Sequence, residues 1–180
     1  GVRTKTVETT AAPAGAEILD VATGTGKQAF AFAKMGLTVT GIDLSEDMLK
    51  IARKNNKYNN LKFETGDATQ LPYPDARFDV SCISLALHDM PASIREQVLL
   101  EMIRVTRPGG IITVVDYALA ENRLFKNLAY AAIKSYESKY YPEYVKNDFT
   151  GLLKRSGINI VAERKVMFGM GRIVKGVKAG

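Results

Sequence analysis

Short apolar runs alternate with longer amphipathic stretches along most of the chain. Apolar runs that end at turn residues are typical of buried strands, and the amphipathic stretches between them predict helices. Strands and helices that alternate in this way form right-handed βαβ units and a mostly parallel sheet covered on both faces. We expect strands at residues 17–21, 38–43, 61–65, 78–85 and 111–116, and helices at 27–35, from the N-cap Ser45 to about 55–56, and at 91–105.

The last third of the chain departs from this alternation. Two helices in succession are expected there, at residues 122–140 and 144–156, followed by strands at 158–164 and 172–177. A Gly-Met-Gly segment, residues 169–171, separates the last two strands, and glycine is typical of hairpin turns. We therefore expect the final strands to pair as an antiparallel hairpin.

The composition fits a single domain over residues 1–180. The chain is 46% hydrophobic and 24% charged, as ordinary folded domains are. Its one cysteine, Cys82, cannot form an internal disulfide, and no Cys/His spacing suggests a metal site. The first sixteen residues contain no apolar stretch of signal-peptide or membrane-spanning length. We expect a cytoplasmic protein with no metal and no membrane span, and leave peripheral membrane contact open.

The net charge of +6 would attract anionic partners such as nucleic acid or a membrane surface. The basic residues are nevertheless spread along the chain, as on ordinary solvated faces. We therefore do not expect a nucleic-acid partner. The densest groups are Lys50, Arg53, Lys54 and Lys57 on one expected helix, and Lys154 with Arg155 on another.

A glycine-rich loop follows the first expected strand. Gly24 and Gly26 permit positive φ angles and a close approach of backbone to ligand. Taken alone, their spacing also matches the dinucleotide fingerprint or a simple tight turn. A phosphate-binding P-loop is excluded, because Val21 stands where that motif needs glycine and Gln28 where it needs serine or threonine.

Two carboxylates separate the remaining alternatives. Asp20, just before the glycines, is a poor neighbour for an anionic pyrophosphate. It suits the ammonium group of an amino-acid-bearing sulfonium, which can also bond to carbonyls of the turn from Ala22 through Thr23 to Gly24. Asp43, at the end of the second strand, can accept both hydroxyls of a ribose, with helix capping as the alternative role.

The third expected loop supplies another acidic residue at a strand end. Asp67, between Gly66 and Ala68, can accept the exocyclic amine of an adenine that lies over the loop. Leu44 and Met48 would provide an apolar wall beside that base.

Four segments in this order resemble the motifs of class I S-adenosylmethionine-dependent methyltransferases. They are ILDVATGTG (18–26), TGIDLSEDML (40–49), FETGDATQLPYPDARFDV (63–80) and EMIRVTRPGGIITVVD (101–116), and the nearest resemblance is to the ubiquinone/menaquinone C-methyltransferase group and small type 11 methyltransferases.

The resemblance implies an α/β, doubly wound, Rossmann-like sheet of seven strands, mostly parallel with an antiparallel C-terminal strand. It implies S-adenosylmethionine as cofactor and S-adenosylhomocysteine as product. Residues 17–116 would bind the cofactor. Only sixteen residues precede the first strand, where many relatives have a longer helical lid. The expected cofactor contacts are Asp20, Ala22, Thr23, Gly24, Gly26, Asp43, Leu44, Met48, Gly66, Asp67, Ala68, Ser84 and Leu85.

His88, the only histidine, follows the fourth expected strand and is the candidate general base. A base is needed only if the acceptor must lose a proton. The ordinary pKa of histidine suits that task, and the adjacent Asp89 can raise the basicity of the ring. A helix-capping or pocket-lining role is the alternative. Cys82 lies within the strand, which disfavours a covalent cysteine mechanism.

Six of the eight tyrosines fall between residues 117 and 144. We expect Tyr117, Tyr136 and Tyr140 to line the acceptor pocket with His88, under covering helices in residues 117–157 and beside the strand pair of 158–180. Because Tyr136 and Tyr140 are one helical turn apart, a core or dimer stripe is an equal alternative.

The predicted function is transfer of a methyl group from S-adenosylmethionine to a small-molecule or lipid-precursor acceptor. Whether carbon, nitrogen or oxygen is methylated stays open, as does the choice between monomer and homodimer. The alternatives are methylation of a nucleic acid or protein, a non-catalytic module that binds the cofactor or a nucleoside, and NAD-dependent redox chemistry.

Overall fold

The computed structural model describes residues 1–118 and 139–179. The predicted helix at 122–140 therefore lies outside the described residues except for its last two positions, and Tyr136 lies wholly outside them. In chain order the elements are α1 (Val2–Thr10), β1 (Glu17–Val21), α2 (Lys27–Ala33), β2 (Thr38–Asp43), α3 (Glu46–Asn55), β3 (Leu61–Thr65), β4 (Phe78–Ser84), a 3-10 turn (Leu87–Asp89), α4 (Ala92–Val105), β5 (Thr106–Tyr117), α6 (Tyr141–Tyr144), α7 (Phe149–Arg155), β6 (Ile158–Val166), a second 3-10 turn (Met167–Gly169) and β7 (Gly171–Lys178).

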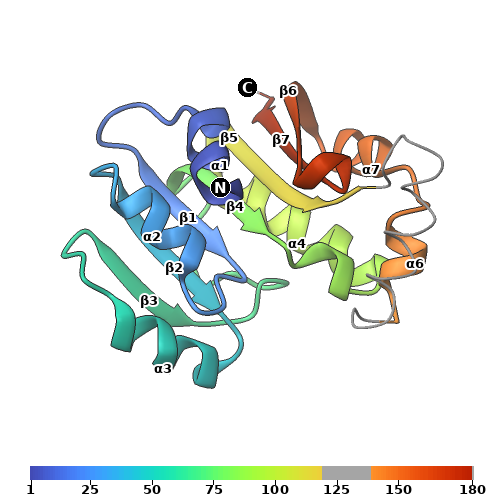
Figure 1. Ribbon diagram of the computed structural model, residues 1–180. Helices are drawn as coiled ribbons and strands as arrows, with labels where there is room; N and C mark the ends of the chain where they lie inside the picture. Colours follow the sequence, from blue (N-terminus) through green and yellow to red (C-terminus); the bar gives the residue numbers. More distant parts are fainter. Residues whose placement is uncertain (119–138, 180) are drawn as a thin grey trace.

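Seven strands form one sheet in the order β3-β2-β1-β4-β5-β7-β6 (Figure 1). Strands β1 to β5 pair in parallel, and β7 pairs antiparallel with both β5 and β6. The strand order reverses between β1 and β4, because the chain first builds outward through β2 and β3 and then returns to the other side of β1. An open parallel sheet binds ligands beyond the carboxyl ends of its strands at such a reversal. The predicted fold class is confirmed.

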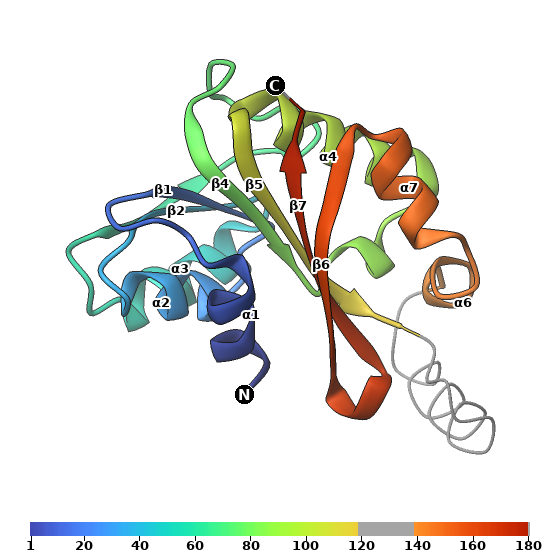
Figure 2. The same ribbon diagram turned by 90° about the horizontal axis from the view of Figure 1, so that it is seen from above.

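Helices cover both faces of the sheet (Figure 2). Helices α1, α2 and α3 lie on one face, and α4 and α7 on the other. Successive side chains of a strand point to opposite faces, so Ile18 of β1 belongs to one apolar core and its neighbour Leu19 to the other. This double burial explains why a central strand such as β1 is buried at nearly every position.

The start of α3 follows the prediction closely. The Ser45 side chain accepts a hydrogen bond from the Met48 N–H at 3.4 Å, and Glu46 and Asp47 occupy the first turn. Negative side chains are favourable there because the N-terminus of a helix carries partial positive charge.

The structure corrects the sequence analysis at several element bounds. The helix expected at 144–156 is shortened to α7 (Phe149–Arg155), because Asp148 caps its start by accepting a hydrogen bond from the Gly151 N–H, and Tyr144 ends the separate short helix α6. The expected strand at 78–85 ends at Ser84, since Leu85 has a φ of 55°. The fifth strand begins at Thr106, five residues earlier than the expected 111. The helix expected at 27–35 ends at Ala33.

Helix α1 was not predicted, because it shows no apolar stripe. Its buried residues are Thr6 and Thr10, and the Thr10 hydroxyl lies 2.9 Å from the Thr113 hydroxyl on β5. A helix whose buried side chains are threonines shows no periodic pattern of hydrophobic residues in the sequence.

Two findings concern the described residues as a set. None of their helices has the length and apolar character to cross a membrane. Among the same residues, no cluster of three or more His, Cys, Asp or Glu side chains is arranged to hold a metal ion.

Candidate active site

The loop after β1 depends on glycine. Gly24 and Gly26 have φ angles of 54° and 76°, which side chains other than glycine adopt at a cost. A Cβ atom on Gly26 would lie 2.6 Å from Cζ of Phe63. The predicted reason for glycine here, positive φ, is confirmed, and packing against the Phe63 ring is a second reason that the sequence did not reveal.

Asp20 is a buried carboxylate at the end of β1. It is 1% exposed and accepts a hydrogen bond of 2.5 Å from the Thr23 hydroxyl. Burial raises its pKa to about 7, although its hydrogen bonds with Thr23 and the Ala29 backbone oppose this shift. Within residues 1–118 and 139–179, no lysine or arginine forms an ion pair with it. A buried carboxylate of this kind favours the arrival of a cation.

Asp43 joins the first two loops. Its Oδ2 accepts from the Gly24 N–H at 2.7 Å and its Oδ1 from the Ser45 N–H at 2.8 Å. Capping of α3 belongs to the Ser45 side chain, so the capping alternative does not account for Asp43. Each carboxylate oxygen can accept two hydrogen bonds, which leaves both oxygens with capacity for a ligand hydroxyl.

The loop after β3 lies beside the first two loops. The Gly66 N–H donates to the Asp43 carbonyl at 3.0 Å, which brings the third loop to the second. Asp67 Oδ1 accepts from the backbone and hydroxyl of Thr69, and these bonds hold its pKa below the usual range. Leu44 is 71% exposed and Met48 46%, so both present apolar surface to solvent at this edge.

A cavity of about 250 Å³ lies between the first loop and the end of β4. It brings together six of the predicted cofactor contacts; the other seven do not line it. Four of its residues, Arg3, Thr25, Lys27 and Gln28, were not among the predicted contacts. The polar residue at 28, in a helix of mostly apolar positions, was a signal that could have been used. Its lining consists of Arg3, Asp20, Ala22, Thr23, Gly24, Thr25, Lys27, Gln28, Ser84 and Leu85.

His88 lies on the 3-10 turn after β4 and is 3% exposed. Its Nδ1 lies 2.6 Å from Oδ1 of Asp116, which is 1% exposed and also accepts from the backbone N–H groups of His88 and Tyr117. The expected partner, Asp89, is half exposed and lies 3.4 Å from Nε2. The main partner of His88 is therefore Asp116, at the end of β5, which sequence analysis missed because it lies 28 residues away.

Aromatic rings surround His88. The rings of Tyr117, Tyr141 and Tyr144 meet it edge to face, with centroid distances of 4.7, 6.4 and 6.4 Å. Tyr117 thus contacts His88, and its role in an acceptor pocket stays a prediction. Tyr140 lies at the start of α6, where the Lys139 ammonium is 5.0 Å from its ring centroid.

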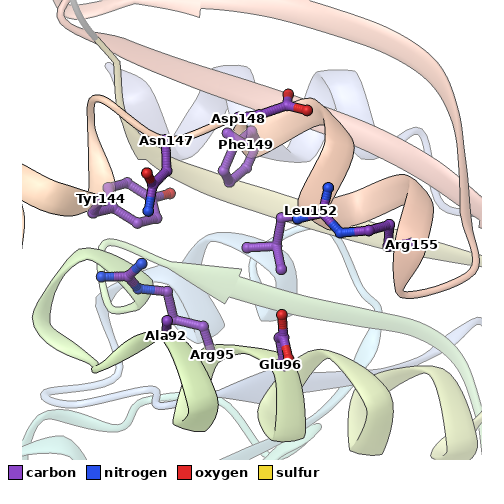
Figure 3. A pocket seen from close by; sticks show the side chains of 9 residues that line it. All are labelled: Ala92, Arg95, Glu96, Tyr144, Asn147, Asp148, Phe149, Leu152 and Arg155. Carbon is purple, nitrogen blue, oxygen red and sulfur yellow. The ribbon is translucent and has the colours of Figure 1, made fainter.

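A second cavity, of about 330 Å³, separates α4 from α7 (Figure 3). Arg95 reaches into this region from α4 and is almost fully buried. Its guanidinium donates to the Leu87 carbonyl and to Glu143, and lies 4.9 Å from the Tyr144 ring centroid. Arg95 therefore links α6 to the 3-10 turn on which His88 lies. Leu152 and Arg155 of α7 line the opposite side.

Comparisons with known proteins identify the family of the chain. Residues 18–110 match the family model described as a methyltransferase domain. The chain is 32% identical over 153 residues to a demethylmenaquinone methyltransferase of Renibacterium salmoninarum, covering 85% of this chain and 58% of that protein. It is 42% identical over 119 residues to a ubiquinone/menaquinone biosynthesis C-methyltransferase of Bdellovibrio bacteriovorus, covering 64% and 50%. The chain thus spans about half the length of the curated relatives it matches.

Solved structures show the same fold. A SAM-dependent methyltransferase of Aquifex aeolicus superimposes with a TM-score of 0.76 at 21% identity, covering 97% of this chain and 88% of that one. The family model matches more than half of the residues and includes the glycine loop, Asp43 and Asp67. The chain therefore belongs to the methyltransferase domain family, the class I group that its four motifs resemble.

Proposed function

We propose that this protein binds S-adenosylmethionine and transfers its methyl group to a small-molecule or lipid-precursor acceptor. The observation that carries the proposal is Asp20, a buried carboxylate without a basic partner among the described residues, in a cavity beside a glycine loop. The donor's amino-acid end brings the cation that such a site favours.

Each loop has a role in this proposal. Asp20 and the carbonyls of the glycine loop hold the ammonium group, and Asp43 accepts the ribose hydroxyls with its remaining lone pairs. The adenine lies over residues 66–68, against the exposed side chains of Leu44 and Met48. The free capacity of Asp43 and the solvent-facing apolar side chains support this arrangement.

The bound cofactor supplies an activated methyl group, so the protein mainly aligns donor and acceptor and excludes water. An acceptor carbon or oxygen must also lose a proton. His88 is the proposed group for this step, with Asp116 favouring the tautomer that carries its proton on Nδ1. The aromatic rings around it suit an apolar, ring-containing acceptor.

The names of the relatives suggest a narrower acceptor. The Renibacterium salmoninarum protein is named a demethylmenaquinone methyltransferase, and the Bdellovibrio bacteriovorus protein a C-methyltransferase of ubiquinone/menaquinone biosynthesis. A quinone-type ring is accordingly the acceptor class that we propose. A cytoplasmic location and a monomeric or homodimeric state belong to the same proposal.

Calorimetric titration tests whether the protein binds the proposed cofactor. We expect S-adenosylmethionine and S-adenosylhomocysteine to bind and NAD to give no heat. Asp43→Ala should weaken binding of both by at least about tenfold, because the ribose loses its acceptor. Binding of NAD without binding of the sulfonium compound would contradict the proposal. Release of S-adenosylhomocysteine on addition of a demethylated quinol would then separate an enzyme from a binding module.

A further inference from the structure

Gln28 is a buried polar side chain whose amide makes no hydrogen bond within the described residues. It is 4% exposed, and neither its Oε1 nor its Nε2 has a hydrogen-bond partner among the residues that the structure describes. Buried amide groups are almost always hydrogen-bonded, because loss of water without a replacement bond is costly. An unpartnered amide therefore indicates a ligand group that completes it.

The position of Gln28 shows what that ligand group faces. Gln28 lies in the first turn of α2 and lines the same cavity as Asp20, Thr23 and Arg3. The cavity thus presents a carboxylate, a guanidinium and an amide with one donor and one acceptor group. That combination is complementary to an amino-acid zwitterion, which carries an ammonium and a carboxylate on one carbon.

A packing role does not explain the residue. The following positions of α2 that are buried, Ala29, Phe32 and Ala33, are all apolar and belong to the core on that face. Leucine or methionine at 28 would fill a similar volume without burying two unpaired polar atoms.

We propose that Gln28 is a further cofactor-binding residue that recognises the amino-acid end of the donor. Its NH₂ group donates to the cofactor's carboxylate, which Arg3 approaches from the cavity lining, and its carbonyl oxygen accepts from the ammonium group that Asp20 also binds. The inference rests on the proposed function and adds to Asp20 a second residue that distinguishes an amino-acid-bearing nucleoside from a plain one.

Two ligands separate this role from a general effect on the site. S-adenosylhomocysteine carries the amino-acid end, and 5′-methylthioadenosine has the same nucleoside and sulfur without it. In calorimetric titrations, Gln28→Leu should lower the affinity for S-adenosylhomocysteine by about tenfold or more. It should leave the affinity for methylthioadenosine within about twofold. Gln97→Leu, a matched change at an exposed position of α4, should alter neither.

Thermal unfolding of the ligand-free protein provides a second readout. Gln28→Leu and Gln28→Met should both raise Tm, because each removes an unpaired buried amide. A structural role would lower Tm instead. Methionine keeps the unbranched shape and remains informative if leucine does not fold.

The outcomes distinguish the two proposals. An unchanged affinity for S-adenosylhomocysteine in the Gln28 variants, or an equal loss for both ligands, would overturn the role of Gln28 and leave the proposed function standing. A wild-type protein that binds neither ligand would overturn both.

Discussion

The two sides of the strand-order reversal are built differently. On the β1–β3 side, the polar residues lie in loops that follow one another closely along the chain, and Asp43 bonds to backbone groups of its own loop and the first. On the β4–β5 side, His88 and Asp116 come from segments 28 residues apart and are buried among tyrosines. The first region has free capacity for a ligand, whereas the second is a packed network. Binding and stability should therefore respond oppositely to mutation in the two regions.

The largest effect is expected at Asp20. A carboxyl with a pKa of about 7 in the folded protein, instead of 3.8 when unfolded, keeps a proton that the unfolded chain loses between these values. The contribution of Asp20 to stability therefore falls as pH rises from about 4 to 7. Asp43 adds to this effect, while Arg3 and Lys27 of the cavity lining are the nearby cations. Asp20→Asn should stabilise the ligand-free protein at pH 8 by as much as about 4 kcal/mol, and little at pH 4.

Denaturant unfolding at the two pH values measures this difference. The same variant should bind S-adenosylhomocysteine at least about tenfold more weakly at pH 8, because the ammonium loses its counter-charge. Asp47→Asn, on an exposed carboxylate of α3, is the control: it should cost less than about 1 kcal/mol at either pH and leave affinity within about twofold. A destabilised Asp20→Asn protein would show that this carboxylate serves the fold and not the ligand.

The second prediction concerns Asp116. Asp116→Ala leaves the buried ring of His88 and two backbone N–H groups without their acceptor, so it should destabilise the protein by about 3 kcal/mol. Binding of S-adenosylhomocysteine should stay within about twofold. Asp89→Ala should cost less than about 1 kcal/mol, because that carboxylate is half exposed. Equal losses for the two variants, measured by denaturant unfolding, would contradict the assignment of Asp116 as the main partner.

The smallest effect is expected at Ser45. Ser45→Ala removes the side-chain cap of α3 and should destabilise the protein by about 1 kcal/mol. Asp43 would still accept from the backbone N–H at position 45, so cofactor affinity should change little. Ser93→Ala, at an exposed position of α4, is the matched control. A large loss of affinity in Ser45→Ala would show that the cap, and not the Asp43 contacts, holds the second loop in place.

The sequence predicted the parts of the fold that have a local signal. The strands from Glu17 to Thr65 match the observed bounds: β1 and β2 are mostly buried runs, and the edge strand β3 alternates between buried and exposed positions. Helix α1 gave no such signal, since its buried residues are Thr6 and Thr10. The break at Asp148 was missed because an N-cap within a helical pattern competes with continuation of the helix, and the competition depends on packing.

The residues of the candidate site also differ in whether the sequence could predict them. Asp20, Asp43 and Asp67 were predictable because parallel strands end at one edge of a sheet, so residues that follow successive strands meet in space. The role of Asp116 could not be predicted, although it also lies at the end of a strand. Its contact with His88 depends on how the turn at residues 87–89 packs against β5. Asp89 is next to His88 in the chain, yet the fold leaves it at the surface.

By itself, the sequence determined the family, the topology and the three strand-end carboxylates that we propose for cofactor binding, because alternating apolar runs and strand-end residues are local properties of the chain. Only the tertiary structure decided that Asp20 is buried without a basic partner in the described residues, that Gln28 lines its cavity with an unpaired amide, and that His88 pairs with Asp116. The burial of a side chain and the partner of a polar group depend on how distant elements pack together, and that packing forms only when the chain folds.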